Sequence, residues 1–257
     1  MPPRGCLTSM ARIDLNCDLG EGAGHDAELI PLITSANIAC GVHAGDEDTM
    51  RATVELALRH CVAIGAHPSL DDRAHFGRRE LPVTPAEARV LVLTQTRLLQ
   101  IIAKQCGATV SHVKAHGALY NMAARDAALA AAVADAVHDA DSKLILFGLA
   151  GSKLIEAGKA RGLRVAAEVF ADRTYQADGS LTPRTQPGAM IEAAPAAVAQ
   201  VRRIIGSGLV IATDGTEVPI AADTICLHGD GPHAVFFATH LRTELRKSRI
   251  ELKAVGA

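Results

Sequence analysis

Short apolar runs rich in β-branched residues recur along the chain, and segments with helical character separate them. The runs are residues 12–18, 35–41, 61–68, 110–117, 143–148, 163–172 and 223–230. Strands that alternate with helices in this way form a parallel sheet covered by helices. Seven strands fit either an open doubly wound α/β sheet or a barrel related to the (β/α)8 type. In both folds the functional side chains gather at the carboxyl ends of the strands.

The intervening segments carry helix boundary signals. Thr84, Pro85 and Glu87 combine a cap residue, a first-turn proline and a capping-box glutamate. Apolar residues then follow at broadly helical spacing. Further helices are expected from Ser152 to Gly162, from Pro195 to about Gly206, and from Pro232 towards Lys247.

One segment departs from the βα pattern. Residues 209–220 place Asp214-Gly215 between two strand-like runs, which predicts a hairpin outside the main sheet. No repeat or low-complexity linker interrupts the rest of the chain. We therefore expect a single domain over residues 11–257, preceded by a flexible extension of residues 1–10.

Composition argues against several classes of function. Lys and Arg number 26 and Asp and Glu 28, so the net charge of −2 shows no basic footprint for nucleic acid or an anionic membrane. No apolar run approaches the roughly 18 residues that span a bilayer. The first ten residues lack the apolar core of a signal peptide, and the six cysteines form no CxxC pair. These features favour a cytoplasmic protein with free thiols that acts on a small molecule.

Polar and ionisable residues collect where the strand-like runs end. The candidate site residues are Asp14, Asn16, Asp18, Glu21, His43, Asp46, His67, Lys114, His116, Glu168, Arg173, His228 and Asp230. An unpaired polar group in a buried strand costs about 1–3 kcal/mol, so these groups are expected to face one another across a shared site. Alternation places Lys114 on the same side of its strand as His112 and His116.

Simpler interpretations stand beside this one. Asp14 and Asn16 also suit satisfied positions at a strand end. His43 also suits a supporting role at the helix start of residues 46–48, and His67 before Pro68 is a weak signal by itself. Residues 76–78 read first as part of a solvated loop, with a lip over the site as the alternative.

Three chemistries could use such a cluster. Histidines and aspartates on different strand ends suit Zn²⁺, Mn²⁺ or Fe²⁺, with His43, His67 and His228 as the candidate ligands. Acid–base catalysis without a metal is as compatible. A covalent mechanism is least favoured, because no GxSxG motif is present. Residues 148–154, GLAGSKL, have too short a glycine spacing for a phosphate loop, so the chain carries no specific ATP-binding signal of its own.

Several long strings together resemble one family. They are DLNCDLGEG, NIACGVHAGD, GAHPS with FGRRE, VKAHGALYN, AEVFADRTYQADGSLTPR, GAMI and TICLHGD, and they run in order from residue 14 to about 235. On these strings the chain resembles the family of 5-oxoprolinase A subunits, also called the lactam-utilisation family. The departures are small: a proline is usual where Ala115 stands, and an aromatic residue is common where Val42 stands.

The resemblance implies ATP-dependent opening of 5-oxo-L-proline (pyroglutamate) to L-glutamate, with release of ADP and phosphate. It implies two partner subunits, B and C, with ATP handled jointly with them, and it leaves a divalent metal as an open alternative. The implied fold is a distorted, TIM-like (β/α)7 barrel similar to glycoside hydrolase and deacetylase barrels.

Roles within the site are assigned from position alone. Catalytic roles are predicted for Asp14, Asn16, Asp18, Lys114 and His116. Substrate-binding roles are predicted for Glu21, His43, Asp46, Glu168, Arg173 and Asp230. Arg173 or Lys114 would hold a carboxylate or phosphoryl group, and Asp14, Asp18 or His116 would orient and deprotonate water.

Two rival functions remain open at this point. The same fold analogy suggests a metal-dependent carbohydrate deacetylase, although the absence of Trp and the 3% aromatic content count against a sugar groove. The other rival is a non-catalytic subunit that binds the lactam and delivers it to partners.

Overall fold

The computed structural model describes residues 11–228 and 234–257. Within them, parallel strands close into a ring, because β9 pairs with both β6 and β1. The ring consists of β1 (Arg12–Leu19), β2 (Ser35–Ala39), β3 (Ala63–His67), β4 (Val110–Lys114), β5 (Ile145–Leu149), β6 (Arg164–Phe170) and β9 (Thr224–His228). The prediction of an α/β fold with seven parallel strands is confirmed, and the structure selects the barrel over the open sheet.

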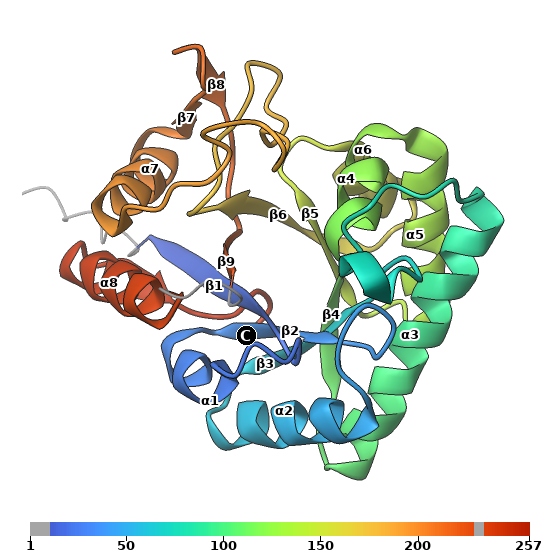
Figure 1. Cartoon of the computed structure of the whole chain (residues 1–257). Coiled ribbons are helices and arrows are strands. Elements are labelled where there is room, and N and C mark those ends of the chain that lie inside the picture. The colour runs from blue at the N-terminus through green and yellow to red at the C-terminus, as the bar shows by residue number, and fades with distance from the viewer. Residues whose placement is uncertain (1–10, 229–233) are drawn as a thin grey trace, which may run out of the picture.

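Helices surround the ring of strands on its outside (Figure 1). They are α1 (Asp26–Leu29), α2 (Glu47–Arg59), α3 (Pro85–Gln105), α4 (Gly117–Arg125), α5 (Ala127–Ala140), α6 (Lys153–Ala160), α7 (Ala194–Ser207) and α8 (Ala234–Lys247), with 3-10 turns η1 (Ile30–Leu32) and η2 (Arg73–His75). None of the helices built from described residues is long and apolar enough to cross a membrane.

Helix boundaries follow the local chemistry of the sequence. Thr84 caps α3, accepting a hydrogen bond from the Glu87 backbone while the Glu87 carboxylate accepts one from the Thr84 backbone. Ser152 caps α6 as expected. Helix α7 runs one residue beyond the expected Gly206, because Gly208 provides the left-handed residue that ends it. The expected start of the last helix, Pro232, lies outside the described residues.

Two further pieces complete the fold. Strands β7 (Leu209–Ile211) and β8 (Glu217–Pro219) form the predicted antiparallel hairpin, separate from the barrel. The short strand β10 (Glu251–Leu252) pairs in parallel with the start of β1, and Val255 packs on the barrel residues Ile145 and Phe147. The predicted extension, residues 1–10, lies outside the described residues.

The first strand shows how the barrel is built. All of its residues after Arg12 are buried, although apolar and polar side chains alternate. Ile13, Leu15, Cys17 and Leu19 belong to the hydrophobic core. Their neighbours Asp14, Asn16 and Asp18 lie on the opposite side of the strand and face the barrel interior. Asp14, Asn16 and Asp18, with the side chains that hydrogen-bond to them, form a polar column inside the barrel that leads to one mouth.

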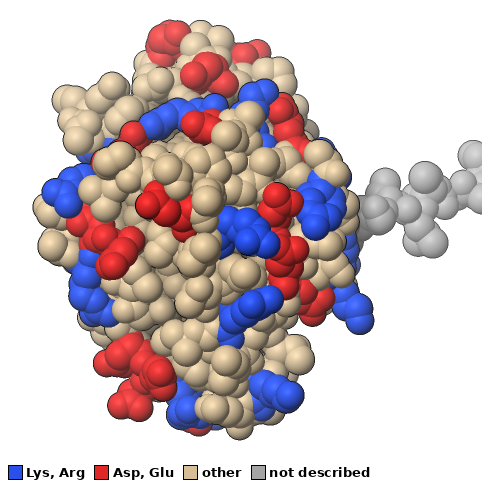
Figure 2. Space-filling model, turned by 90° about the vertical axis from the view of Figure 1, so that its right-hand side faces the viewer, with Lys and Arg blue, Asp and Glu red and all other residues tan. Residues whose placement is uncertain are grey.

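The outer surface carries mixed charge. On the face formed around α3 and α5, acidic and basic side chains are interspersed (Figure 2). Several are paired between helices, including Arg161 with Asp135 at 2.7 Å. This face offers no broad patch of a single sign.

Candidate active site

A cavity of about 780 Å³ opens at the carboxyl ends of the barrel strands. Among the predicted site residues, Asp18, His67, Lys114, His116, Arg173 and His228 line it. The other charged residues on its wall are Arg78, Glu80, Arg125, Asp178 and Arg184. The structure thus brings residues from β1, β3, β4, β6 and β9 to one place, as expected for strand ends of a parallel barrel.

Lys114 is the centre of the polar column. Its ammonium group lies 2.8 Å from Glu168 Oε1, 3.0 Å from Asp18 Oδ1 and 3.3 Å from Asn16 Oδ1. Burial alone would lower the pKa of Lys114, but the adjacent carboxylates raise it well above its usual value. Lys114 therefore stays protonated at neutral pH and acts as a fixed positive charge at the floor of the cavity.

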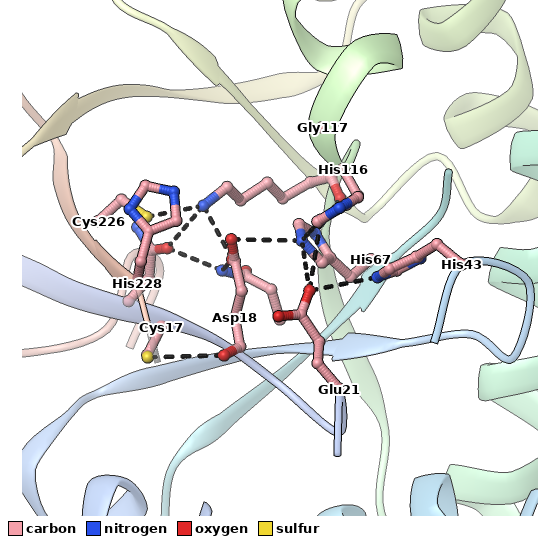
Figure 3. Close-up of polar contacts among 12 residues, drawn as sticks. Cys17, Asp18, Glu21, His43, His67, His116, Gly117, Cys226 and His228 are labelled. Carbon is pink, nitrogen blue, oxygen red and sulfur yellow. Dashed lines mark hydrogen bonds and ion pairs between the residues drawn. The ribbon is translucent and has the colours of Figure 1, made fainter. Parts of the chain in front are cut away.

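Asp18 contacts both Lys114 and His67, and Figure 3 shows it beside His67. The amide of Asn37 donates to its Oδ1 at 2.8 Å, and His67 Nε2 lies 3.3 Å from its Oδ2. Burial would raise the pKa of Asp18, but His67 and Lys114 hold it well below its usual value. Asp18 is consequently ionised at neutral pH and presents a carboxylate to the cavity.

Three histidines and Glu21 meet beside Asp18 (Figure 3). His116 Nδ1 lies 2.9 Å from His67 Nε2, and the rings of His43 and His116 stack with centroids 3.9 Å apart. Glu21 Oε1 lies 3.2 Å from His43 Nε2 and 3.4 Å from His116 Nδ1. Burial and the neighbouring histidines lower the pKa of His43 to about 3 and lower that of His116 well below its usual value. The imidazoles of His43 and His116 are therefore expected to be uncharged at neutral pH.

The loop before α3 closes over these histidines. Phe76 has a left-handed backbone with φ of 56°, and its carbonyl accepts a hydrogen bond from His116 Nε2 at 2.9 Å. A Cβ added to Gly77 would lie 3.1 Å from both His43 and His116. Arg78 then reaches the cavity wall. Residues 76–78 therefore form the lip that the sequence left as an alternative.

A second wall is built from the segment after β6. Arg173 is buried, and its guanidinium donates to the carbonyls of Thr182 and Ala189 at 2.5 and 3.3 Å. Burial and nearby Arg184 lower its pKa to about 10, so it remains a cation at neutral pH. The adjacent Asp172 accepts a hydrogen bond from His228 Nδ1 at 2.7 Å, which orients His228 at the cavity edge.

Not every predicted residue reaches the cavity. Asp14 lies deeper in the barrel, where Thr34, Ser35 and Thr224 donate hydrogen bonds to its carboxylate. Asn16 and Glu168 lie between Asp14 and Lys114 and are fully buried.

The remaining predicted residues lie elsewhere. Asp46 is exposed and caps α2, accepting from the backbone of Thr49 at 2.8 Å, so the structure does not place it with the cluster. Asp230 lies outside the described residues.

Sequence reasoning did not single out every residue of the polar column. The amide nitrogen of Asn37 donates to Asn16 and Asp18, and its oxygen accepts a hydrogen bond from His112 Nε2 at 2.9 Å. The His112 ring also stacks on Phe147. The available signal was a polar residue inside an apolar strand-like run, which marks an inward position in a barrel whose interior is polar.

Comparison with known proteins places the chain in a family. A sequence model described as the LamB/YcsF family matches residues 13–257. The chain belongs to the LamB/YcsF family. A member from Bordetella parapertussis, named as the A subunit of 5-oxoprolinase, is 57% identical over 94% of this chain and 98% of its own length. One of the same name from Tolumonas auensis is 54% identical over 96% of this chain and 100% of its own.

Solved structures agree with this family. The lactam utilization protein of Thermus thermophilus superposes with a TM-score of 0.88 at 42% identity, covering 95% of this chain and 99% of that one. A protein of Enterococcus faecalis V583 superposes with a TM-score of 0.55 at 12% identity, over 95% of this chain and 97% of that one, which shows a shared fold. The resemblance inferred from the sequence strings is confirmed.

Proposed function

We propose that this chain is the A subunit of an ATP-dependent 5-oxoprolinase that opens 5-oxo-L-proline to L-glutamate together with the B and C subunits. The names of the similar proteins, which match over nearly the full length of both chains, support the assignment. The observation that supports a specific active site for this function is the buried Lys114–Asp18 ion pair, which lies at the floor of a cavity in the barrel. A fixed cation beside a fixed carboxylate suits a reaction that polarises an amide and directs water at it.

The substrate has features that the two walls of the cavity match. 5-Oxo-L-proline carries a carboxylate at one end of a five-membered ring and the lactam amide at the other. Arg173, a buried cation with Arg184 close by, would bind the carboxylate, or a phosphoryl group, through charge-assisted hydrogen bonds. The lactam would then face Lys114 and Asp18 across the cavity.

Protonation states decide which groups can act. Lys114 cannot accept a proton at neutral pH, so it would stabilise negative charge that develops on the lactam or phosphoryl oxygen. Asp18 is ionised, so it would orient the attacking water and receive its proton. His67 lies 3.3 Å from Asp18 and would hold its carboxylate in position, and His116 contacts His67 in turn.

ATP supplies what the lactam lacks. The ring amide is unstrained, so water attacks it slowly. Transfer of the γ-phosphoryl group of ATP to the lactam oxygen releases ADP and leaves an electrophilic ring carbon. Water then adds to that carbon, the C–N bond breaks, and the ring nitrogen takes the proton. A second water cleaves the resulting acyl phosphate to glutamate and phosphate. Because the chain contains no phosphate-loop motif of its own, we propose that it handles ATP jointly with the partner subunits.

Reconstitution tests this proposal. Labelled 5-oxoproline is incubated with this chain alone and with co-purified B and C partners, each with and without ATP, and glutamate is quantified. We expect glutamate only in the complete mixture with ATP. Absence of glutamate from a complex shown to be assembled would contradict the proposal.

Matched variants locate the chemistry within the assembled complex. Asp18→Asn and Lys114→Ala are expected to abolish turnover, whereas His75→Gln, a change at an exposed side chain, should leave it unchanged. The complex is purified with each variant so that assembly is verified directly. If Asp18→Asn weakens 5-oxoproline binding in proportion to activity and no phosphorylated intermediate accumulates in any variant, the chain serves to bind the lactam.

A further inference from the structure

Four side chains from successive barrel strands converge at the mouth (Figure 3). Glu21 follows β1, His43 follows β2, His67 ends β3 and His116 follows β4. One nitrogen or carboxylate oxygen from each lies within 4.8 Å of the others. All four side chains are at most 4% exposed.

Backbone hydrogen bonds fix the tautomers of two of these histidines. His67 Nδ1 lies 2.8 Å from the carbonyl of Lys114, and His116 Nε2 lies 2.9 Å from the carbonyl of Phe76. A carbonyl oxygen can only accept, so each of these nitrogens carries its proton. The opposite nitrogens, His67 Nε2 and His116 Nδ1, are therefore the ones that can offer a lone pair to a metal ion.

Those two nitrogens lie 2.9 Å apart, and His67 Nε2 also lies 3.3 Å from Asp18 Oδ2. Two lone pairs at that separation repel unless a proton or a metal ion lies between or beside them. Glu21 Oε1 lies 3.4 Å from His116 Nδ1 and 3.9 Å from His67 Nε2, so an anionic oxygen faces the same space as the two nitrogens. A cation bound by all the converging groups satisfies both lone pairs without charging a buried imidazole.

We propose that Glu21, His43, His67 and His116 bind one divalent transition-metal ion of the Zn²⁺ type. Three imidazoles and a carboxylate form a donor set that Zn²⁺ accepts, whereas Mg²⁺ and Ca²⁺ prefer oxygen ligands throughout. The backbone carbonyls that hold His67 and His116 are the outer partners typical of metal-binding histidines. Gly77 packs closely on His43 and His116, because a Cβ added there would lie 3.1 Å from each of them.

A second cluster at the mouth is a weaker candidate. Asp18, Cys226 and His228 also converge. However, the Lys114 ammonium lies 3.0 Å from both Asp18 Oδ1 and Cys226 Sγ, so a metal ion there would meet a fixed positive charge. Burial also raises the pKa of Cys226, which keeps the thiol protonated.

The metal proposal deepens the proposed function, because His67 and His116 line the same cavity, but its test needs no turnover. When bound, such an ion would supply Lewis acidity towards a lactam or phosphoryl oxygen or lower the pKa of a bound water. Metal binding could hold even if 5-oxoproline proved not to be the substrate, and the two proposals can fail separately.

Metal content and affinity test the site. The full-length chain is stripped with chelator, reloaded with Zn²⁺, and measured by mass spectrometry of the metal and by titration against a Zn²⁺ indicator. We expect one ion per chain, and a loss of affinity above about 100-fold in Glu21→Gln and His43→Gln, because loss of outer partners alone costs 10–100-fold. His228→Gln belongs to the rival cluster and should keep full affinity.

A crystallographic experiment on the wild-type protein tests the metal site even if the variants fail to fold. Anomalous scattering at the zinc edge from Zn²⁺-loaded crystals should give a peak bounded by Glu21, His43, His67 and His116. Sub-stoichiometric binding by the wild type, a peak elsewhere, or loss of the ion in His228→Gln but not in His43→Gln would each overturn the proposal. A proton shared by His67 and His116 would then account for their contact.

Discussion

Removal of the Lys114 ammonium tests the electrostatics of the barrel interior. Lys114→Met keeps the length of the side chain but leaves Asp18 and Glu168, which lie 3.0 and 2.8 Å from the ammonium, without that partner. Breaking a buried ion pair by removing one member costs about 3–5 kcal/mol. At 1.4 kcal/mol per factor of ten, the folded-to-unfolded ratio should decrease by about 140- to 3,700-fold. This loss is a large part of the free energy of unfolding, which is about 5–15 kcal/mol for a typical domain.

The loss should depend on pH in a definite direction. In the wild type, the pKa of Asp18 is held well below its usual value, so its contribution to stability is present above the unfolded pKa and lost as the pH falls through the folded pKa. In Lys114→Met, the pKa of Asp18 is higher than in the wild type, because the ammonium no longer offsets burial, and protonation of Asp18 relieves part of the buried charge. The destabilisation should therefore be greater at pH 7 than at pH 5.

Urea unfolding followed by far-UV circular dichroism measures this effect, since the chain has no Trp for fluorescence. Lys153→Met is the matched control, because Lys153 forms an exposed pair with Glu156 and should cost less than about 1 kcal/mol. The double variant Lys114→Met/Glu168→Gln should recover at least about 0.5 kcal/mol of the lost free energy of unfolding, because it removes one of the two carboxylates left without the ammonium. A loss below about 1 kcal/mol, or one equal at pH 5 and pH 7, would refute the reasoning.

Three further predictions concern packing, thiols and capping. Gly65→Ala should destabilise the protein by about 1–3 kcal/mol or more, because the new Cβ would lie 2.0 Å from His112 Nε2. Gly206→Ala in α7 should stabilise it by about 0.4–1 kcal/mol, because the new Cβ meets nothing within 4 Å. Urea unfolding in which both variants shift the free energy of unfolding in the same direction would contradict this. In the native protein a disulfide reagent should modify the exposed Cys61 far faster than the buried Cys17, Cys40 and Cys226, because burial raises the pKa of those three thiols. Rapid labelling of the three buried thiols in native Cys61→Ser would contradict this prediction. Asp126→Ala should cost about 1 kcal/mol, because Asp126 caps α5 through the Ala128 and Leu129 backbones; no change in the urea midpoint would argue against that capping.

The βα order could be predicted from sequence because it leaves a local pattern. Each barrel strand overlaps an apolar run, and cap residues such as Thr84 and Ser152 mark helix starts in the expected places. Closure of the barrel could not be predicted in this way. It depends on pairing of β1 with β9, which are some two hundred residues apart, and no local signal encodes that contact. The two-residue strand β10 is likewise too short to leave a pattern.

The site illustrates a second limit. Alternation in β1 correctly places Asp14, Asn16 and Asp18 on one side of the strand, but it does not show how far each side chain lies from the mouth of the barrel. At about 3.3 Å per residue, Asp14 lies about 13 Å below Asp18, which separates the barrel floor from the cavity. Asp46 shows the converse case. An Asp at a strand end that also precedes a helix serves as its cap, so the local interpretation prevails over the composite site.

The central claim is that the lactam binds in the cavity above Lys114, and a crystal structure of the chain with 5-oxo-L-proline tests it most directly. We predict the ring in the cavity with its amide facing Lys114 and Asp18 and its carboxylate near Arg173. A ligand bound elsewhere on a chain that supports turnover in the assembled complex would contradict the account.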